Sequence, residues 1–242
     1  MVDSLHIIIP VYNEGENIAK TLSEIESKIT TPHTILIVYD FDEDNTLPIV
    51  NEIVRLQNSK NILLVKNGLG RGVLNAIRTG FDSVKEGAVL AVMADSSDNL
   101  SIVDSMFQKI NQGYDIVCGS RYMKGGKQIG GPRLKRLLSM MIGISLHLLT
   151  NIPTHDVTNS FKMYRKSVLS DVEIESSGGF EIGMEIVVKA FFKGYKIAEI
   201  PSTWQDRVAG KSNFKLLNWS PGYLRWYLYA VKVRFRNMLG LK

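Results

Sequence analysis

Short apolar runs alternate with amphipathic stretches along the first half of the chain. The runs are typical of strands, because each is apolar and is bounded by polar or glycine residues. Between them, apolar side chains recur at helical spacing, as at Ile18, Leu22 and Ile25. The alternation predicts an α/β fold with a doubly wound, mainly parallel sheet and helices on both faces. The predicted strands are 5–11, 34–39, 61–65, 88–94 and 115–119, and the predicted helices are 18–29, 46–56, 73–81 and 102–110.

The stretch 88–99 is the most informative part of this pattern. An apolar run, 88–94, ends abruptly in Asp95, Ser96, Ser97 and Asp98. A strand buried on both faces would place these carboxylates at its carboxyl end, where open α/β sheets bind ligands. Two acids at this spacing can share one Mg²⁺ or Mn²⁺ with substrate phosphates. A polar turn in which Asp98 or the next residue caps a helix explains the same residues equally well.

Polar clusters also follow other predicted strands, at 13–14, 40–44 and 120–121. The carboxyl ends of parallel strands meet at one edge of a sheet, so together with 95–98 these clusters favour a single site there. The loop 68–72 has glycine at alternate positions and could bind a phosphate or form a tight turn. It matches neither the Rossmann nor the P-loop pattern.

The second half begins with a basic helix start. Residues 130–132 are Gly-Gly-Pro, and Arg133, Lys135 and Arg136 follow directly. Cations at a helix N-terminus oppose the helix dipole, so they indicate a bound anion such as phosphate, unless they point into solvent. The helix then continues to residue 149 with apolar side chains nearly all round, which indicates a buried helix or one in contact with lipid. It is too short to span a bilayer.

The last stretch, 223–241, carries an apolar stripe, a basic stripe and several Trp and Tyr residues. This pattern is typical of a helix lying on an anionic membrane surface. A terminal helix packed on its own domain would show the same stripe, so both interpretations stay open. We expect residues 1–218 to form one domain and residues 219–242 a C-terminal amphipathic helix.

The overall composition narrows the class of protein. The chain has 242 residues, is 45% hydrophobic and carries a net charge of +5, which is too diffuse to indicate nucleic acid binding. A single cysteine, Cys118, excludes an internal disulfide framework. No signal peptide or membrane-spanning run is recognisable. We therefore expect a cytoplasmic protein.

From residue 6 to about 216 a series of motifs resembles family 2 inverting glycosyltransferases of the GT-A fold. The resemblance is strongest to the polyprenyl-phosphate sugar synthases, which include dolichol-phosphate mannose synthases. It implies a nucleotide-sugar half, 1–122, and an acceptor half, 123–218. The motifs are IIIPVYNE at 7–14, VYDFDEDNT at 38–46, GRG with AIRTG at 70–80, DIVCGSRY at 115–122, HDVTNSFK at 155–162, FEIGME at 180–185 and RVAGKS at 207–212.

The resemblance also implies roles for individual residues. Asp95 falls on the second position of the family's DxD metal motif, and Met93 replaces the first. The implied metal ligands for Mg²⁺ or Mn²⁺ are Asp95, Ser97 and Asp98. The implied catalytic residues are Asp95, Arg207 and Glu185. The implied nucleotide-sugar residues are Pro10, Tyr12, Asn13, Glu14, Asp40, Gly70, Arg71, Ala94 and Arg121, and the implied acceptor-phosphate residues are Lys135, Arg136, Ser139 and Lys211.

The reaction that the resemblance implies is transfer of a sugar, with inversion, from a nucleotide diphosphate sugar to a polyprenyl or dolichyl phosphate. A peripheral protein on the cytoplasmic face of the membrane would carry it out, with a homo-oligomer or a membrane subunit left open. One alternative is transfer to a saccharide or glycolipid hydroxyl, which needs a general base such as Asp156, Glu181 or Glu185. Another is a non-catalytic module that binds a nucleotide sugar, which the loss of an Asp at Met93 suggests.

Overall fold

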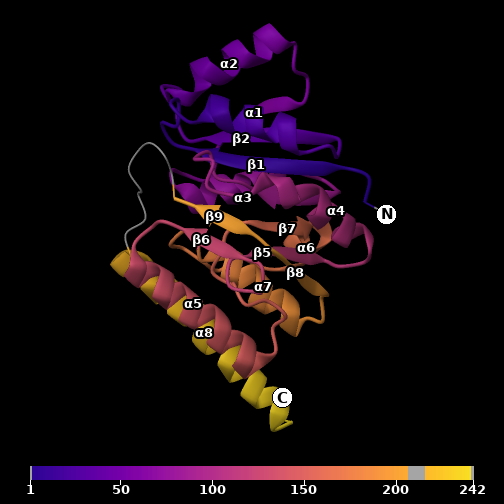
Figure 1. Cartoon of the computed structure of the whole chain (residues 1–242), viewed down its shortest axis with the longest axis vertical. Helices are drawn as coiled ribbons and strands as arrows, with labels where there is room; N and C mark the ends of the chain where they lie inside the picture. The colour runs from indigo at the N-terminus through magenta and orange to yellow at the C-terminus, as the bar shows by residue number, and fades with distance from the viewer. Residues whose placement is uncertain (1, 207–215, 241–242) are drawn as a thin grey trace.

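The computed structural model describes residues 2–206 and 216–240 (Figure 1). Its main sheet has the strand order β3-β2-β1-β4-β7-β5-β8, and β6 and β9 form a separate pair. The sheet is parallel except at β7, which runs antiparallel between β4 and β5. The strands are β1 (Leu5–Val11), β2 (His33–Tyr39), β3 (Ile62–Lys66), β4 (Ala88–Ala91), β5 (Ile116–Ser120), β6 (Lys127–Ile129), β7 (Lys162–Arg165), β8 (Ile197–Pro201) and β9 (Thr203–Gln205).

Helices cover both faces of this sheet, as the sequence pattern predicted. Ile7 and Ile9 of β1 are buried in one core cluster, whereas Ile8 is buried in the other. Side chains alternate across a strand, so an uninterrupted apolar run fills two cores at once. The helices are α1 (Ile18–Lys28), α2 (Thr46–Gln57), α3 (Val73–Ser83), α4 (Val103–Asn111), α5 (Arg133–Thr150), α6 (Lys166–Asp171), α7 (Ile182–Phe192) and α8 (Leu216–Met238), with a short 3₁₀ helix at Leu100–Ile102.

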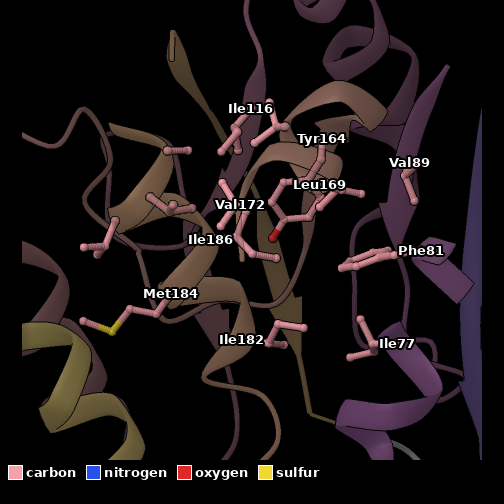
Figure 2. Close-up of a cluster of buried hydrophobic side chains, with 14 of the residues drawn as sticks. Ile77, Phe81, Val89, Ile116, Tyr164, Leu169, Val172, Ile182, Met184 and Ile186 are labelled. Carbon is pink, nitrogen blue, oxygen red and sulfur yellow. The ribbon is translucent and has the colours of Figure 1, made fainter. Parts of the chain in front are cut away.

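The core between α3 and α7 closes one face of the sheet. Figure 2 shows Ile77 and Phe81 of α3 on one side and Ile182 and Ile186 of α7 on the other. Tyr164 of β7 lies among them, and its ring meets the Phe81 ring edge to face at 5.8 Å. This packing joins the first half of the chain to the second.

The main sheet differs from the prediction in the length of β4 and in two strands that were not predicted, β7 and β8. The strand expected over 88–94 stops at Ala91, because β7 pairs only with residues 88–90 and the chain then turns toward Asp95. β7 itself was not predicted. It is short and begins and ends with a basic residue, so its sequence lacks the apolar run by which the other central strands were recognised.

α5 and α8 lie side by side along one edge of the molecule (Figure 1). The Tyr227 hydroxyl of α8 donates to Ser145 Oγ of α5 at 3.0 Å. α8 also packs on its own domain through Trp226, which is buried and donates from Nε1 to Ser176 Oγ at 2.9 Å. The opposite sides of both helices are exposed, as at Met141 and Leu228. The C-terminal helix is therefore docked on the domain and also presents an apolar face, and the predicted boundary at residue 218 falls inside it.

No helix in the described ranges is both long enough and apolar enough to cross a membrane.

Candidate active site

The first two polar clusters interlock at the carboxyl ends of β1 and β2. The backbone N–H of Asn13 donates to Asp44 Oδ2 at 3.0 Å, and that of Glu14 donates to Thr46 Oγ1 at 2.9 Å. Asp44 and Thr46 are buried. Asn13 takes a left-handed backbone conformation with φ of 54°, which an asparagine tolerates better than most residues. These bonds fix the turn that follows β1.

Asp40 organises the glycine loop. Its Oδ1 accepts from Asn67 Nδ2 at 2.7 Å, and its Oδ2 accepts from the Gly72 N–H at 2.9 Å. Gly70 and Gly72 have φ values of 96° and 126°, which side chains with a Cβ rarely adopt. The loop is thus a tight turn, and the Asp40 carboxylate holds it at the same sheet edge as β1.

An aromatic and cationic cluster lies beside this turn. The Phe41 ring meets the Tyr12 ring edge to face at 5.5 Å, and the Arg71 guanidinium lies 4.9 Å from the centre of the Phe41 ring. Tyr12 is 53% exposed. Exposed aromatic and guanidinium groups can stack on a planar base and attract phosphate, so this cluster suits a nucleotide.

The turn after β4 carries the candidate metal ligands. Asp95 Oδ1 accepts from the Ser97 N–H at 3.1 Å, and Asp98 Oδ2 accepts from the Met93 N–H at 3.5 Å. Burial, followed by the negative charge of Asp95, raises the pKa of Asp98 to about 7. The two carboxylates are therefore close enough to interact.

This donor set fits a divalent cation only in part. Among the described residues no group of three or more His, Cys, Asp or Glu side chains could hold a metal ion. Mg²⁺, however, is often held by one or two carboxylates and completes its shell with substrate phosphates and water. The turn supplies two carboxylates, Asp95 and Asp98, and Met93 stands where the family motif would supply a further one.

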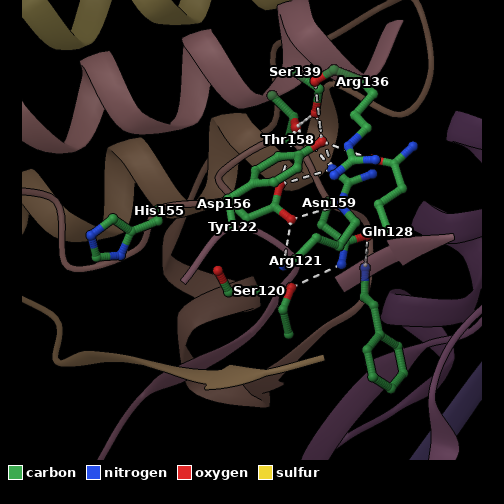
Figure 3. A network of polar contacts seen from close by, with 12 residues as sticks. Ser120, Arg121, Tyr122, Gln128, Arg136, Ser139, His155, Asp156, Thr158 and Asn159 are labelled. Carbon is green, nitrogen blue, oxygen red and sulfur yellow. Dashed lines mark hydrogen bonds and ion pairs between the residues drawn. The ribbon is translucent and has the colours of Figure 1, made fainter. Parts of the chain in front are cut away.

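Arg121 forms the centre of a second polar network at the end of β5 (Figure 3). Its Nε donates to Asp156 Oδ2 at 2.7 Å and its Nη2 to Asp156 Oδ1 at 2.8 Å. Burial alone would raise the pKa of Asp156, but the charge and hydrogen bonds of Arg121 outweigh it and hold that pKa below its usual value. The same Nη2 donates to Ser139 Oγ of α5 at 3.0 Å. The network therefore ties the sheet edge to the basic start of α5.

The predicted nucleotide-sugar residues all lie at or just beyond the carboxyl ends of β1 to β5. Of the predicted acceptor residues, Ser139 contacts Arg121, Lys135 is half-buried and Arg136 is exposed. Arg207 and Lys211 lie outside the described residues. Gln205, the last residue but one before them in the described chain, is anchored at the turn after β4, since its N–H donates to Ser97 O at 3.0 Å.

Glu185 makes its hydrogen bonds and its ion pair with residues outside these clusters. It is fully buried, and its carboxylate accepts from the N–H groups of Glu175 and Ser176 at 2.6 and 2.9 Å. Lys189 forms an ion pair with it at 2.8 Å. These contacts anchor the segment before α7, and they do not support the predicted catalytic role of Glu185.

Sequence reasoning missed two supporting side chains. Asn67 follows β3 and holds Asp40, so the rule that found the other polar clusters could have found it. Thr21 of α1 donates to Ala94 O at 2.8 Å and supports the turn after β4 from a helix far away in sequence. No spacing in the sequence indicates that contact.

Comparison with known proteins agrees with this arrangement. The profile of the family described as "Glycosyl transferase family 2" matches residues 6–173. The chain is 30% identical over 214 residues to a dolichol-phosphate mannosyltransferase of Pyrococcus furiosus, covering 86% of this chain but only 58% of that protein. It is 27% identical to a polyprenol monophosphomannose synthase of Mycolicibacterium smegmatis, covering 97% and 90%, and 27% identical to a dolichyl-phosphate hexose transferase of Haloferax volcanii, covering 85% and 84%.

Solved structures with lower sequence identity share the fold. S. aureus TarS (residues 1–349) superposes with a TM-score of 0.63 at 17% identity, covering 97% of this chain and 66% of that one. Glucosyl-3-phosphoglycerate synthase from Mycobacterium tuberculosis, in complex with Mn²⁺, UDP and glucosyl-3-phosphoglycerate, superposes with a TM-score of 0.65 at 13% identity, covering 99% and 81%. The family match and the shared GT-A architecture confirm the resemblance seen in the sequence motifs, and the chain belongs to glycosyl transferase family 2.

Proposed function

We propose that the protein transfers a sugar from a nucleotide diphosphate sugar to a polyprenyl phosphate, with inversion at the anomeric carbon. Three relatives named for dolichyl or polyprenyl phosphate chemistry support the acceptor class. The chemistry requires a bound leaving diphosphate on one side of the sugar and an anionic phosphate oxygen on the other.

The observation that carries this proposal is that each candidate general base already accepts hydrogen bonds from the protein with both of its carboxylate oxygens. A hydroxyl acceptor needs a carboxylate or imidazole within reach to take its proton. Asp156 is fully buried against Arg121, and both oxygens of Glu181 accept from the N–H groups of Gly178 and Gly179. Both oxygens of Glu185 likewise accept from backbone N–H groups, those of Glu175 and Ser176. A lipid phosphate is already anionic near neutral pH, since the second pKa of a phosphate monoester is about 6, so it needs no such base.

The acceptor phosphate would bind at the start of α5. The N-terminal N–H groups of a helix attract anions, and here Lys135, Arg136 and the fixed Arg121 add positive charge. Ser139 offers a hydroxyl next to Arg121. Lys211 would join them by the family resemblance. Since Arg121 is already held by Asp156, it would need no rearrangement to face the phosphate.

Asp95 and Asp98 would hold Mg²⁺ or Mn²⁺, with Ser97 beside them. A bound divalent ion would neutralise charge on the departing diphosphate. Asp40, Tyr12 and Arg71 would bind the nucleoside end of the donor, and the family resemblance places Arg207 at the diphosphate. The buried Asp98 must lose its proton before it can act as a ligand.

The exposed sides of α5 and α8 support attachment to a membrane surface. Neither helix contains an acidic residue, and both carry several Lys and Arg residues. Basic helices with exposed apolar side chains bind anionic bilayers. We call this face the α5–α8 surface; its large exposed apolar residues are Leu134, Leu137, Leu138, Met141, Leu148, Leu149, Leu224, Leu228, Tyr229, Phe235 and Met238.

Membrane attachment through this surface would bring Ser139 close to the lipid headgroups, where a polyprenyl phosphate exposes its phosphate. We place the protein on the cytoplasmic face. An additional membrane subunit or a homo-oligomer is compatible with the same surface.

Transfer of labelled sugar separates the alternatives. Purified protein is incubated with nucleotide sugars, Mn²⁺ or Mg²⁺, and either polyprenyl phosphate or a panel of saccharides. We expect a labelled polyprenyl-phosphate sugar and no labelled saccharide. Products with saccharides alone would refute the proposal. Met93 specifically favours a third outcome, a non-catalytic module, which predicts a nucleotide-dependent rise in Tm without any product.

A further inference from the structure

We propose that Glu199 is a positioning residue for the acceptor site and that it acts through His155 on Asp156. The inference rests on the proposed function, because it takes the Arg121–Asp156 pair as part of the acceptor-phosphate site. Glu199 itself lies on β8, paired with Cys118 of β5.

Glu199 holds a single residue with both carboxylate oxygens. Oε2 accepts from the backbone N–H of His155 at 2.8 Å, and Oε1 contacts Nδ1 of the His155 ring at 2.6 Å. The Glu199 side chain is only 11% exposed. A carboxylate that grips the backbone and the ring of one residue fixes both the position and the orientation of that residue.

His155 is also held from the side of α5. Gly143 approaches so closely that a Cβ built there would lie 2.2 Å from the carbonyl oxygen of His155. The His147 ring of α5 lies against the His155 ring, with centroids 4.2 Å apart and planes tilted by 32°, and His147 Nδ1 contacts Ile152 O at 2.7 Å. His155 is therefore fixed between β8 and the helix that would carry the acceptor phosphate.

The next residue in the chain is Asp156, which determines where Arg121 points. Its Oδ2 accepts from both the backbone N–H and Nε of Arg121, at 2.9 and 2.7 Å. A displacement of the His155 backbone would move this carboxylate directly. In metal sites, removing a group that orients a binding residue commonly changes affinity 10–100-fold, and Glu199 orients the residue next to Asp156 in a comparable way.

The test compares Glu199→Ala with a matched control, Asp171→Ala. Asp171 also accepts two side-chain hydrogen bonds, from Lys193 at 2.8 Å and from Tyr195 at 2.9 Å. These bonds join the end of α6 to the segment that follows α7. We expect Glu199→Ala to raise the KM for a short-chain polyprenyl phosphate by about tenfold while the KM for the nucleotide sugar stays unchanged. Asp171→Ala should change neither. An unchanged acceptor KM, or an equal rise in both KM values, would overturn the proposal.

Two further variants separate positioning from general stability. Glu199→Gln keeps an oxygen for the His155 N–H and should recover most of the acceptor KM. The double variant Glu199→Ala with His155→Ala should be no worse than the more impaired single variant, because residues that act in series are not additive. Full additivity would show that Glu199 does not act through His155.

Hydrogen exchange tests the same contact without any assay of activity. Amides of residues 152–158 should exchange faster in Glu199→Ala than in the wild type or in Asp171→Ala. If they do not, the positioning role is refuted, whatever the acceptor is. If they do, but the wild-type protein gives no product with polyprenyl phosphate, the proposed function fails while the Glu199–His155 contact stands.

Discussion

Arg121 and Asp156 form a two-pronged ion pair whose side chains are only 10% and 0% exposed. Arg121 follows β5 in the half of the chain that resembles a nucleotide-sugar unit, and Asp156 lies in the acceptor half. The pair therefore links the two halves of the chain directly, through hydrogen bonds of 2.7 and 2.8 Å. Such a link presents a guanidinium in one fixed orientation.

Removing one partner of this pair should be costly. Asp156→Asn would leave the Arg121 charge buried without its counter-ion, a change that typically costs about 3–5 kcal/mol. We expect the free energy of unfolding, measured by urea denaturation at pH 7.5, to fall by about that amount. Asp171→Asn, which weakens an exposed pair with Lys193, should have a much smaller effect, because solvent screens that pair. If the two substitutions lowered the free energy of unfolding equally, the Arg121–Asp156 pair would contribute no more to stability than an exposed ion pair.

Asp98 predicts a particular dependence of stability on pH. Its pKa is raised from 3.8 to about 7 in the folded protein, first by burial and then by Asp95. Between those pH values the folded chain holds a proton that the unfolded chain has released, so the free energy of unfolding falls as pH rises through this window. The slope is at most about 1.4 kcal/mol per pH unit.

Asp98→Asn should remove this slope. Chemical denaturation in EDTA between pH 4 and pH 8 would measure it, with Asp42→Asn as the control because Asp42 is exposed at the surface. We expect the Asp98 variant to gain stability relative to the wild type as pH rises toward 8. A parallel pH dependence in wild type and variant would show that Asp98 titrates normally.

The sequence predicted the part of the sheet formed by β3, β2, β1 and β4 better than the part formed by β7, β5 and β8. Ile7, Ile37 and Leu90 belong to strands buried on both faces, and such strands show themselves as uninterrupted apolar runs. β7 is equally buried, but Lys162 is accommodated there by donating to the carbonyl oxygens of Val157 and Asn159. A sequence pattern cannot reveal that a lysine is satisfied inside a core.

The candidate site shows the same division. Side chains that follow parallel strands, such as Asp40 and Asp95, could be grouped because topology alone brings them to one edge. The Arg121–Asp156 contact depends on the path of the loop before β7, which no periodicity encodes. Glu185 shows another limit of the pattern, since its place in a family motif gave no hint that its carboxylate accepts from two backbone N–H groups; its catalytic role stays a prediction.

Metal binding should respond in opposite directions to two substitutions in the same turn. Asp95→Asn removes a candidate ligand and should weaken Mn²⁺ binding at least tenfold, whereas Met93→Asp restores a carboxylate and should strengthen it. Mn²⁺ titration followed by electron paramagnetic resonance, with a nucleoside diphosphate present, measures both. Turnover that survives intact in Asp95→Asn would remove this residue from the metal site.

Glu185→Gln should lower stability without impairing chemistry. The substitution weakens the bonds from Glu175 and Ser176 and breaks the ion pair with Lys189, so Tm should fall by several degrees. Because Glu185 contacts none of the polar clusters at the sheet edge, we expect kcat to stay within about twofold of the wild type when it is measured well below Tm. A loss of kcat of about a hundredfold or more in a folded variant would restore its predicted catalytic role.

The α5–α8 surface predicts where a single added charge weakens membrane binding. Leu137 and Leu228 are 48% and 57% exposed on α5 and α8, and each leucine that enters a bilayer contributes about 1.5–3 kcal/mol. Leu137→Glu or Leu228→Glu should therefore lower the partition constant on anionic vesicles at least tenfold in co-sedimentation. Leu56→Glu is the control, because Leu56 is 71% exposed on α2, at the opposite end of the molecule (Figure 1).

High salt should weaken wild-type binding, since the surface carries cations and no acidic residue lies on either helix. If all three variants bound equally well, the membrane would have to be contacted elsewhere, and the position of Ser139 beside the headgroups would lose its support.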